Sequence, residues 1–141
     1  MKPRTLATGE AAPPKAASLY GELIAEHWKR PRNQGPLEAP DVSREELNPL
    51  CGDRLRLELK IDNEAITDAR FRGDACMVAT AAASLLTTAL HGMPVAQAGA
   101  FSEERLLALL GGRLRPARVA CALLVLTALR EGLKARAGGV R

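Results

Sequence analysis

The chain has 141 residues and a mass of 15.0 kDa, the size of one domain with its own hydrophobic core. Hydrophobic residues make up 47% and charged residues 26%, which excludes a chain that is disordered throughout or collagen-like. Aromatic residues are only 3%, too few for the stacking that single-stranded nucleic acids need, so we expect no nucleic-acid partner.

The net charge of +4 is unevenly placed, because seven basic groups and one acidic group fall in residues 113–141. This basic segment is either a solvated helix face or a docking surface for an acidic protein. Residues 1–17 lack the apolar core of a secretory signal, and no stretch has the ~20 apolar residues of a membrane span. We therefore expect a cytoplasmic protein with no membrane partner.

The N-terminal residues 1–17 are predicted to form a disordered arm, followed by one domain over 18–135 and a frayed tail over 136–141. Ser18 is predicted to cap the first helix, which Pro31 ends. The apolar stripe of this helix consists of Leu19, Leu23, Ile24 and Trp28.

Prolines make the segment 31–49 irregular, with one short edge strand expected near Val42. Strand alternation follows, and Asp62-Asn63 provides turn chemistry between two strands of a hairpin. The first strand is predicted to bury Leu55, Leu57, Leu59 and Ile61 and to expose Arg54, Arg56, Glu58 and Lys60; the second, 65–72, is predicted to place Thr67, Ala69 and Phe71 on one side.

Helical patterns fill the rest of the chain. Residues 76–90 are uncharged and rich in Ala and Leu, Ser102 opens a helix that Gly111-Gly112 closes, and the last helix runs from Pro116 to about Lys134. The sum is an α+β fold, a small antiparallel sheet of about three strands with helices packed on one face.

Three cysteines and one aspartate carry the candidate chemistry. Cys51 precedes the first long strand, Cys76 begins a helix, and Cys121 lies in the first turns of the last helix. Helix N-termini favour thiolates, and Arg118 is close enough in sequence to add to this effect at Cys121. Asp53 can face the same side as Cys51, because residues two apart in an extended chain do so.

This donor set suits either a tetrahedral zinc site or an iron–sulfur cluster. Spacing alone also allows three inert core thiols, because there is no Cys-x-x-Cys pair and cysteine is often buried as a small hydrophobe. An odd number of cysteines favours free or metal-bound thiols over disulfides.

Four blocks, in order, resemble the U-type iron–sulfur cluster assembly scaffolds, the family of IscU, SufU and the N-terminal domain of NifU. The resemblance covers residues 18–134. The first block is Leu19-Tyr20 together with 27–33 and Gly35, and the second is Cys51-Gly52-Asp53-Arg54. The third is 71–76 together with Ser84, and the fourth is 116–121.

The resemblance implies that Cys51, Asp53, Cys76 and Cys121 meet at one exposed end and hold zinc, iron or a transient [2Fe–2S] cluster. It implies a sulfur acceptor that takes persulfide sulfur from a pyridoxal-phosphate cysteine desulfurase, SufS-like in the SUF system, and serves downstream apo iron–sulfur proteins. The acceptor role would fall on Cys51 by similarity to SufU or on Cys121 by similarity to IscU. A scaffold that is not an enzyme is the expected function, and a zinc-dependent sulfurtransferase that builds no cluster is the alternative.

The third block departs from IscU. Ala120 stands where IscU proteins have histidine, so the third cysteine is SufU-like, and residues 114–118 replace the chaperone-recognition segment, so we expect no dedicated Hsp70 partner. The 45 positions from Cys76 to Cys121 lack the insertion usual in SufU proteins.

Overall fold

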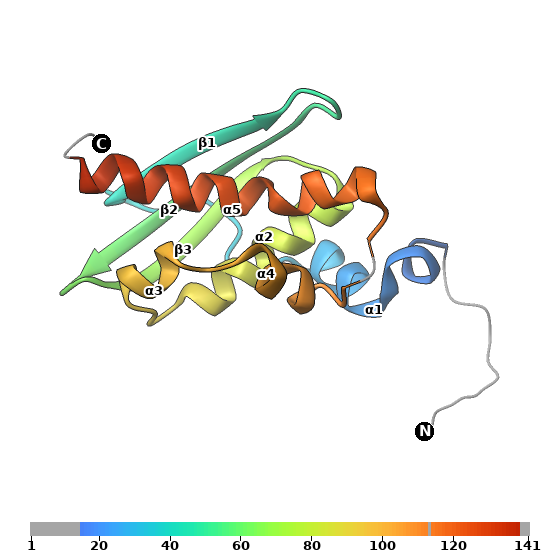
Figure 1. The fold of residues 1–141 in the computed structure, drawn as a ribbon, viewed down its shortest axis with the longest axis horizontal. Helices are drawn as coiled ribbons and strands as arrows, with labels where there is room; N and C mark the ends of the chain where they lie inside the picture. Colours follow the sequence, from blue (N-terminus) through green and yellow to red (C-terminus); the bar gives the residue numbers. More distant parts are fainter. Residues whose placement is uncertain (1–14, 113, 139–141) are drawn as a thin grey trace, which may run out of the picture.

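In the computed structural model, the described residues form a three-stranded sheet and five helices (Figure 1). The structure describes residues 15–112 and 114–138, with side chains from residue 21 onward. The elements, in chain order, are α1 (Lys15–Lys29), β1 (Val42–Asn48), β2 (Asp53–Asp62), β3 (Ala65–Asp74), α2 (Met77–Leu90), α3 (Val95–Gly99), α4 (Glu103–Leu109) and α5 (Pro116–Ala137).

The sheet is antiparallel with the order β1-β2-β3, so β2 is its central strand. This confirms the predicted edge strand near Val42 and the predicted hairpin, whose turn places Asn63 and Glu64 at positive φ. The ends of β1 and β2 that meet at the turn over 49–52 also lie beside the end of β3 that leads into α2. Four chain segments therefore converge at one end of the sheet.

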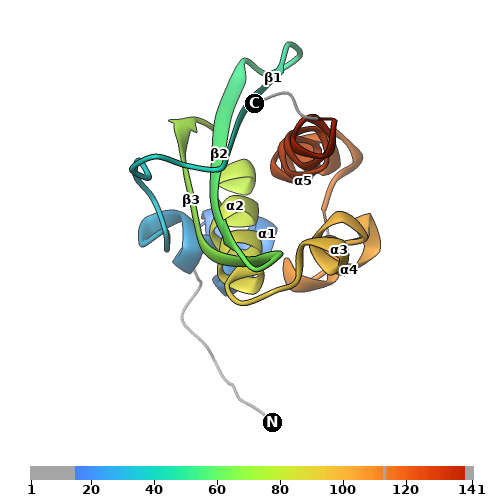
Figure 2. The ribbon, with the colours of Figure 1, turned by 90° about the vertical axis from the view of Figure 1, so that its left-hand side faces the viewer.

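Helices α2 and α5 lie on the same side of the sheet (Figure 2). Helix α5 packs against β1 and β2, α2 packs against β3, and α1 packs on α2. Both layers are apolar where they meet, which confirms the α+β fold with helices on one face. Fully buried members of this core include Leu55, Leu57, Leu59, Ile66, Leu86, Leu106, Leu126 and Leu129.

A β-bulge corrects the predicted faces of β3. The pairing of β2 with β3 shifts between Lys60 and Ile61, and beyond it Ile61 pairs with Ile66. The extra residue in β3 turns Thr67 out to solvent and buries Ile66, so the prediction that Thr67 shares a side with Ala69 and Phe71 was wrong. Simple alternation cannot show such an insertion, because the sequence on both sides of it keeps period two.

The alternation in β2 predicted that the outer face of the sheet is exposed along its whole length. The structure shows that part of this face is buried. Glu58 is only 5% exposed, because the segment between α1 and β1 covers it. Its carboxylate accepts hydrogen bonds from the Leu37 N–H at 3.0 Å and the Ser43 hydroxyl at 3.0 Å. Burial alone would raise the pKa of Glu58, but these bonds and the Arg72 charge hold it below its ordinary value.

The first helix begins earlier than predicted. It starts at Lys15, three residues before the predicted cap at Ser18, and Gly21 interrupts it with non-helical dihedral angles. Most of the predicted arm, residues 1–14, lies outside the described residues, as do residues 139–141 of the predicted tail. In the part of the chain that the structure describes, none of the helices has the length and apolarity to cross a membrane.

His27 has a structural role, because it joins α1 to α2. It is 8% exposed and its Nδ1 lies 2.7 Å from the hydroxyl oxygen of Ser84 in α2. That oxygen also accepts the N–H of Arg32 at 2.9 Å, so the pair joins α1, the following loop and α2. Burial lowers the pKa of His27 and the charge of Arg32 adds to this.

This lowered pKa predicts a pH dependence of stability. The unfolded chain binds the His27 proton more tightly than the folded one, so the free energy of unfolding is expected to fall as pH drops below the ordinary pKa of 6.5. Urea unfolding at about pH 7.5 and pH 5.5 measures the fall, which His27→Gln should reduce. His91→Gln is the control, because these are the two histidines of the chain. An equal fall in the His27→Gln variant would contradict the assignment.

Candidate metal and sulfur centre

Cys51 lies on the exposed turn that joins β1 to β2. The Asn48 carbonyl accepts the Gly52 N–H at 2.7 Å, and Gly52 takes a φ of 77°, a left-handed value that suits glycine. Leu50 and Cys51 are both exposed on this turn, Leu50 to 92%. The turn therefore offers the Cys51 thiol to solvent and to other molecules.

Asp53 is the first residue of β2 and is only 5% exposed. Its Oδ1 accepts the backbone N–H of Cys76 at 2.9 Å, which ties the start of β2 to the start of α2. Its Oδ2 is buried and has no hydrogen-bond partner. A buried carboxylate oxygen without a partner is costly, and it is the kind of atom that a bound cation would satisfy.

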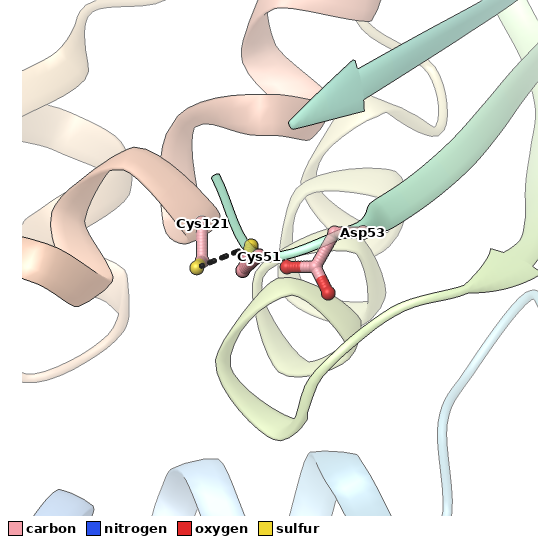
Figure 3. Close-up of side chains that lie close together, drawn as sticks. All are labelled: Cys51, Asp53 and Cys121. Atoms are coloured by element: carbon pink, nitrogen blue, oxygen red, sulfur yellow. Dashed lines mark hydrogen bonds between the residues drawn. The ribbon is translucent and has the colours of Figure 1, made fainter. Parts of the chain in front are cut away.

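Cys121 completes a group of three close side chains. It is 1% exposed in the second turn of α5, and its Sγ lies 3.5 Å from the Sγ of Cys51. Figure 3 shows these two sulfurs facing each other, with one oxygen of Asp53 directed toward Cys51. One ligand atom from each of the three residues lies within 4.8 Å of the other two.

Cys76, the fourth predicted ligand, is beside this group but not in it. Its sulfur caps α2 and accepts the Ala79 N–H at 3.5 Å. It is still close enough for its interaction with Cys121 to raise the pKa of that thiol. Asp74 is the last residue of β3, and Cys76 occupies the N-cap of α2.

The charges of the site follow from burial and hydrogen bonding. Burial alone would raise the pKa of Asp53, but hydrogen bonding from Cys51 and from the thiol and N–H of Cys76 lowers it below its ordinary value. Burial raises the pKa of Cys121 to about 12, and its contact with Cys51 adds to the rise, while Arg118 opposes it. Arg118 lowers this pKa as predicted, but burial outweighs it, so the prediction of a favoured thiolate at Cys121 was wrong.

Two donors face the buried sulfur. The Arg118 guanidinium lies 3.8 Å from the Sγ of Cys121, and the side-chain amide of Asn48 lies 3.9 Å from it. The oxygen of the same Asn48 amide accepts the Leu50 N–H at 3.1 Å. Asn48 thus joins the Cys51 turn to Cys121. The sequence analysis missed it, although Asn before Pro is a turn signal.

Asn48 is expected to position the ligands. Asn48→Ala removes both side-chain contacts and should weaken zinc binding by roughly tenfold, the scale of an outer-sphere substitution. Asn48→Asp keeps the acceptor for Leu50 but replaces the donor to Cys121, so it separates the two contacts. Competition with a chromogenic chelator measures both affinities. Unchanged zinc affinity in Asn48→Ala would show that the turn over 49–52 keeps its position without the Asn48 side chain.

The residues of the group fit a metal ion. Zinc binds thiolate sulfur at ~2.3 Å, and two such sulfurs at a tetrahedral angle lie about 3.8 Å apart, close to the separation seen here. Asp53 would add a carboxylate oxygen, and its Oδ2 has no hydrogen-bond partner. Metal binding would displace the thiol protons, so the raised pKa of Cys121 makes metal affinity fall at low pH.

The comparisons agree with this geometry. The NifU-like N terminal domain family matches residues 19–138. The chain is 34% identical to the zinc-dependent sulfurtransferase SufU of Bacillus subtilis, over 86% of this chain and 94% of that protein. It is also 34% identical to the iron–sulfur cluster assembly scaffold protein IscU of Streptococcus pyogenes, over 85% of this chain and 86% of that one.

A solved structure shares the fold. The N-terminal part of a nitrogen-fixing NifU-like protein from Brucella abortus aligns with a TM-score of 0.72 at 18% identity, over 87% of this chain and 97% of that one. At this identity the likeness concerns the fold alone. The match across residues 19–138, the two curated relatives and the shared fold identify the chain as a member of the NifU-like N-terminal domain family, to which IscU and SufU belong.

Proposed function

We propose that this protein is an iron–sulfur cluster assembly scaffold and sulfur acceptor. Cys51, Asp53, Cys76 and Cys121 are its proposed ligands for zinc, iron or a transient [2Fe–2S] cluster. The observation that carries the proposal is the convergence of two sulfurs and a carboxylate from three elements within 4.8 Å. Cys76 would join as the fourth ligand by releasing the Ala79 N–H that it caps.

Its proposed sulfur donor is a pyridoxal-phosphate cysteine desulfurase of the SufS kind. A donor persulfide, R–S–SH, exchanges with a cysteine thiol to give R–SH and a cysteine persulfide, so atoms and electrons balance. Cys51 and Cys121 are the candidate acceptors. Downstream apo iron–sulfur proteins are the proposed recipients. Three free thiols, two of them in contact, suit a reducing compartment such as the cytoplasm.

A zinc-dependent sulfurtransferase is the second candidate. Two observations favour it, namely Ala120 before the third cysteine and the Arg118 guanidinium 3.8 Å from the Cys121 sulfur. In this function zinc would position the thiolates and polarise them, and the chain would pass sulfur on without forming a cluster.

Anaerobic reconstitution tests the proposal. The full-length chain is mixed with a cysteine desulfurase, cysteine, ferrous iron and a thiol reductant that supplies the electrons for reducing sulfane sulfur. Under the scaffold function, visible absorption of a cluster develops on this chain, and the cluster then transfers to an apo-ferredoxin. Cys51→Ser and Cys121→Ser should each abolish the absorption.

The same reaction separates the two candidates. Persulfide on this chain without cluster absorption would support the sulfurtransferase. Neither persulfide nor cluster, in a protein that holds its fold by circular dichroism, would contradict both.

A further inference from the structure

The two thiols at the site differ in access although they are in contact. Cys51 is exposed on the turn between β1 and β2, whereas Cys121 is 1% exposed in α5. Their sulfurs are 3.5 Å apart, in van der Waals contact, so an outer sulfur bonded to Cys51 at ~2.05 Å can also reach the Cys121 sulfur. A sulfur donor that approaches from solvent therefore meets Cys51 first, while Cys121 is reached from within the site.

We propose that sulfur accepted by Cys51 is passed within the chain to Cys121, so that the exposed thiol receives sulfur and the buried thiol stores it. The proposal rests on the proposed function as a sulfur acceptor and adds an order of events to it. Both residues touch the moving sulfur and are therefore catalytic residues of the relay.

The step needs no oxidant or reductant. The Cys121 sulfur attacks the outer sulfur of the Cys51 persulfide, an S–S bond to Cys121 forms, and the S–S bond to Cys51 breaks. Cys51 keeps that bond's electron pair and takes up the proton that Cys121 loses. The products are a Cys51 thiol and a Cys121 persulfide, so the same groups are present on both sides.

The surroundings of Cys121 favour it as the storage position. The Asn48 amide and the Arg118 guanidinium both direct donors at its sulfur, at 3.9 Å and 3.8 Å. Burial also keeps solvent thiols away from the stored sulfur, which prevents its loss as sulfide. Cys76 is the less suitable receiver, because its sulfur lies outside the close group of Cys51, Asp53 and Cys121.

The sequence makes the relay directly measurable. Trypsin cuts after arginine and lysine, so each cysteine falls on its own peptide: Cys51 on 45–54, Cys76 on 73–105 and Cys121 on 119–130. The full-length chain is treated with glutathione persulfide, a bulky donor that needs no desulfurase. Samples are alkylated at successive times and digested, and mass spectrometry locates the added sulfur.

The relay predicts a time order and a dependence on Cys51. In the unaltered chain, sulfur is expected on 45–54 first and on 119–130 later. Cys51→Ser should slow labelling of 119–130 at least tenfold, and Cys121→Ser should leave sulfur on 45–54. His91→Gln, a substitution outside the site, is the control and is expected to keep the order of the unaltered chain. Circular dichroism shows that each variant keeps its fold.

Three results would overturn the relay. Equal labelling of 119–130 in Cys51→Ser would mean that the donor reaches Cys121 directly, and sulfur that stays on 45–54 would mean that no transfer occurs. A disulfide between the two peptides with release of sulfide would mean that Cys121 attacks the inner sulfur instead. Persulfide on 45–54 alone leaves the acceptor function intact, whereas no persulfide on any peptide, even from the desulfurase, contradicts that function itself.

Discussion

Addition of zinc at a hundred times its dissociation constant is expected to raise the Tm of the metal-free protein by roughly 5–10 °C. Such an excess of ligand stabilises the folded state by about 2.7 kcal/mol, and a chain of this length gains a few degrees per kcal/mol. The physical reason is that the proposed ligands come from separate parts of the chain and meet only in the folded state. Thermal melts with zinc, and after a chelator is added, measure the rise and its reversal.

Ligand variants give this prediction its controls. Cys51→Ser, Cys121→Ser and Asp53→Asn should each remove most of the rise, because each takes away one of the three close ligands. Cys76→Ser should remove less, because its sulfur lies outside that group. A variant without all three cysteines that retains the full rise would show that zinc stabilises the protein elsewhere.

Gly73→Ala is expected to destabilise the fold by roughly 3–5 kcal/mol, combining a strained backbone with a steric clash. Gly73 has a φ of 145° and pairs with Leu55 where β3 turns toward Cys76. A β-carbon there would collide with the carbonyl oxygen of Arg54 and lie 3.0 Å from the Leu55 α-carbon. Because both contacts are backbone atoms of the central strand, the clash cannot be relieved by a side-chain movement. Urea unfolding measures the loss.

Gly35→Ala is the matched control for this clash. Gly35 has a similar φ of 130°, but a β-carbon there would meet nothing within 4 Å. It should therefore lose only about 1–2 kcal/mol, the cost of the backbone strain. Equal losses in the two variants would mean that β2 and β3 separate easily beside the site.

The fold was predictable where periodicity carries the signal. Alternation in 55–61 and the small apolar residues of 76–90 indicated the sheet and its helical cover. Three features had no such signal: the bulge that exposes Thr67, the burial of Glu58 by the α1–β1 segment, and the short helix α3. Each depends on tertiary contacts, which single-sequence patterns do not contain.

The site was predictable as a set of residue types rather than as a geometry. Motif resemblance selected four ligand candidates, and three of them lie together. Two features depend on exact side-chain positions. The Cys76 sulfur caps α2, and burial has a larger effect on the pKa of Cys121 than its place near the start of a helix. Asn48 was missed because its role arises from contacts to Leu50 and Cys121, which are far apart in the sequence.

The hydrogen bond from Cys76 to Asp53 has a consequence for how the site opens. It fixes the first residue of β2 to the first turn of α2, on the opposite side of the site from α5. Asp53 and Cys76 are therefore held together directly, whereas α5 brings Cys121 to the centre from the opposite side. Zinc bound at the proposed centre should therefore slow the exchange of amide hydrogens in the first turns of α5, because it would join Cys121 to the ligands on the other side.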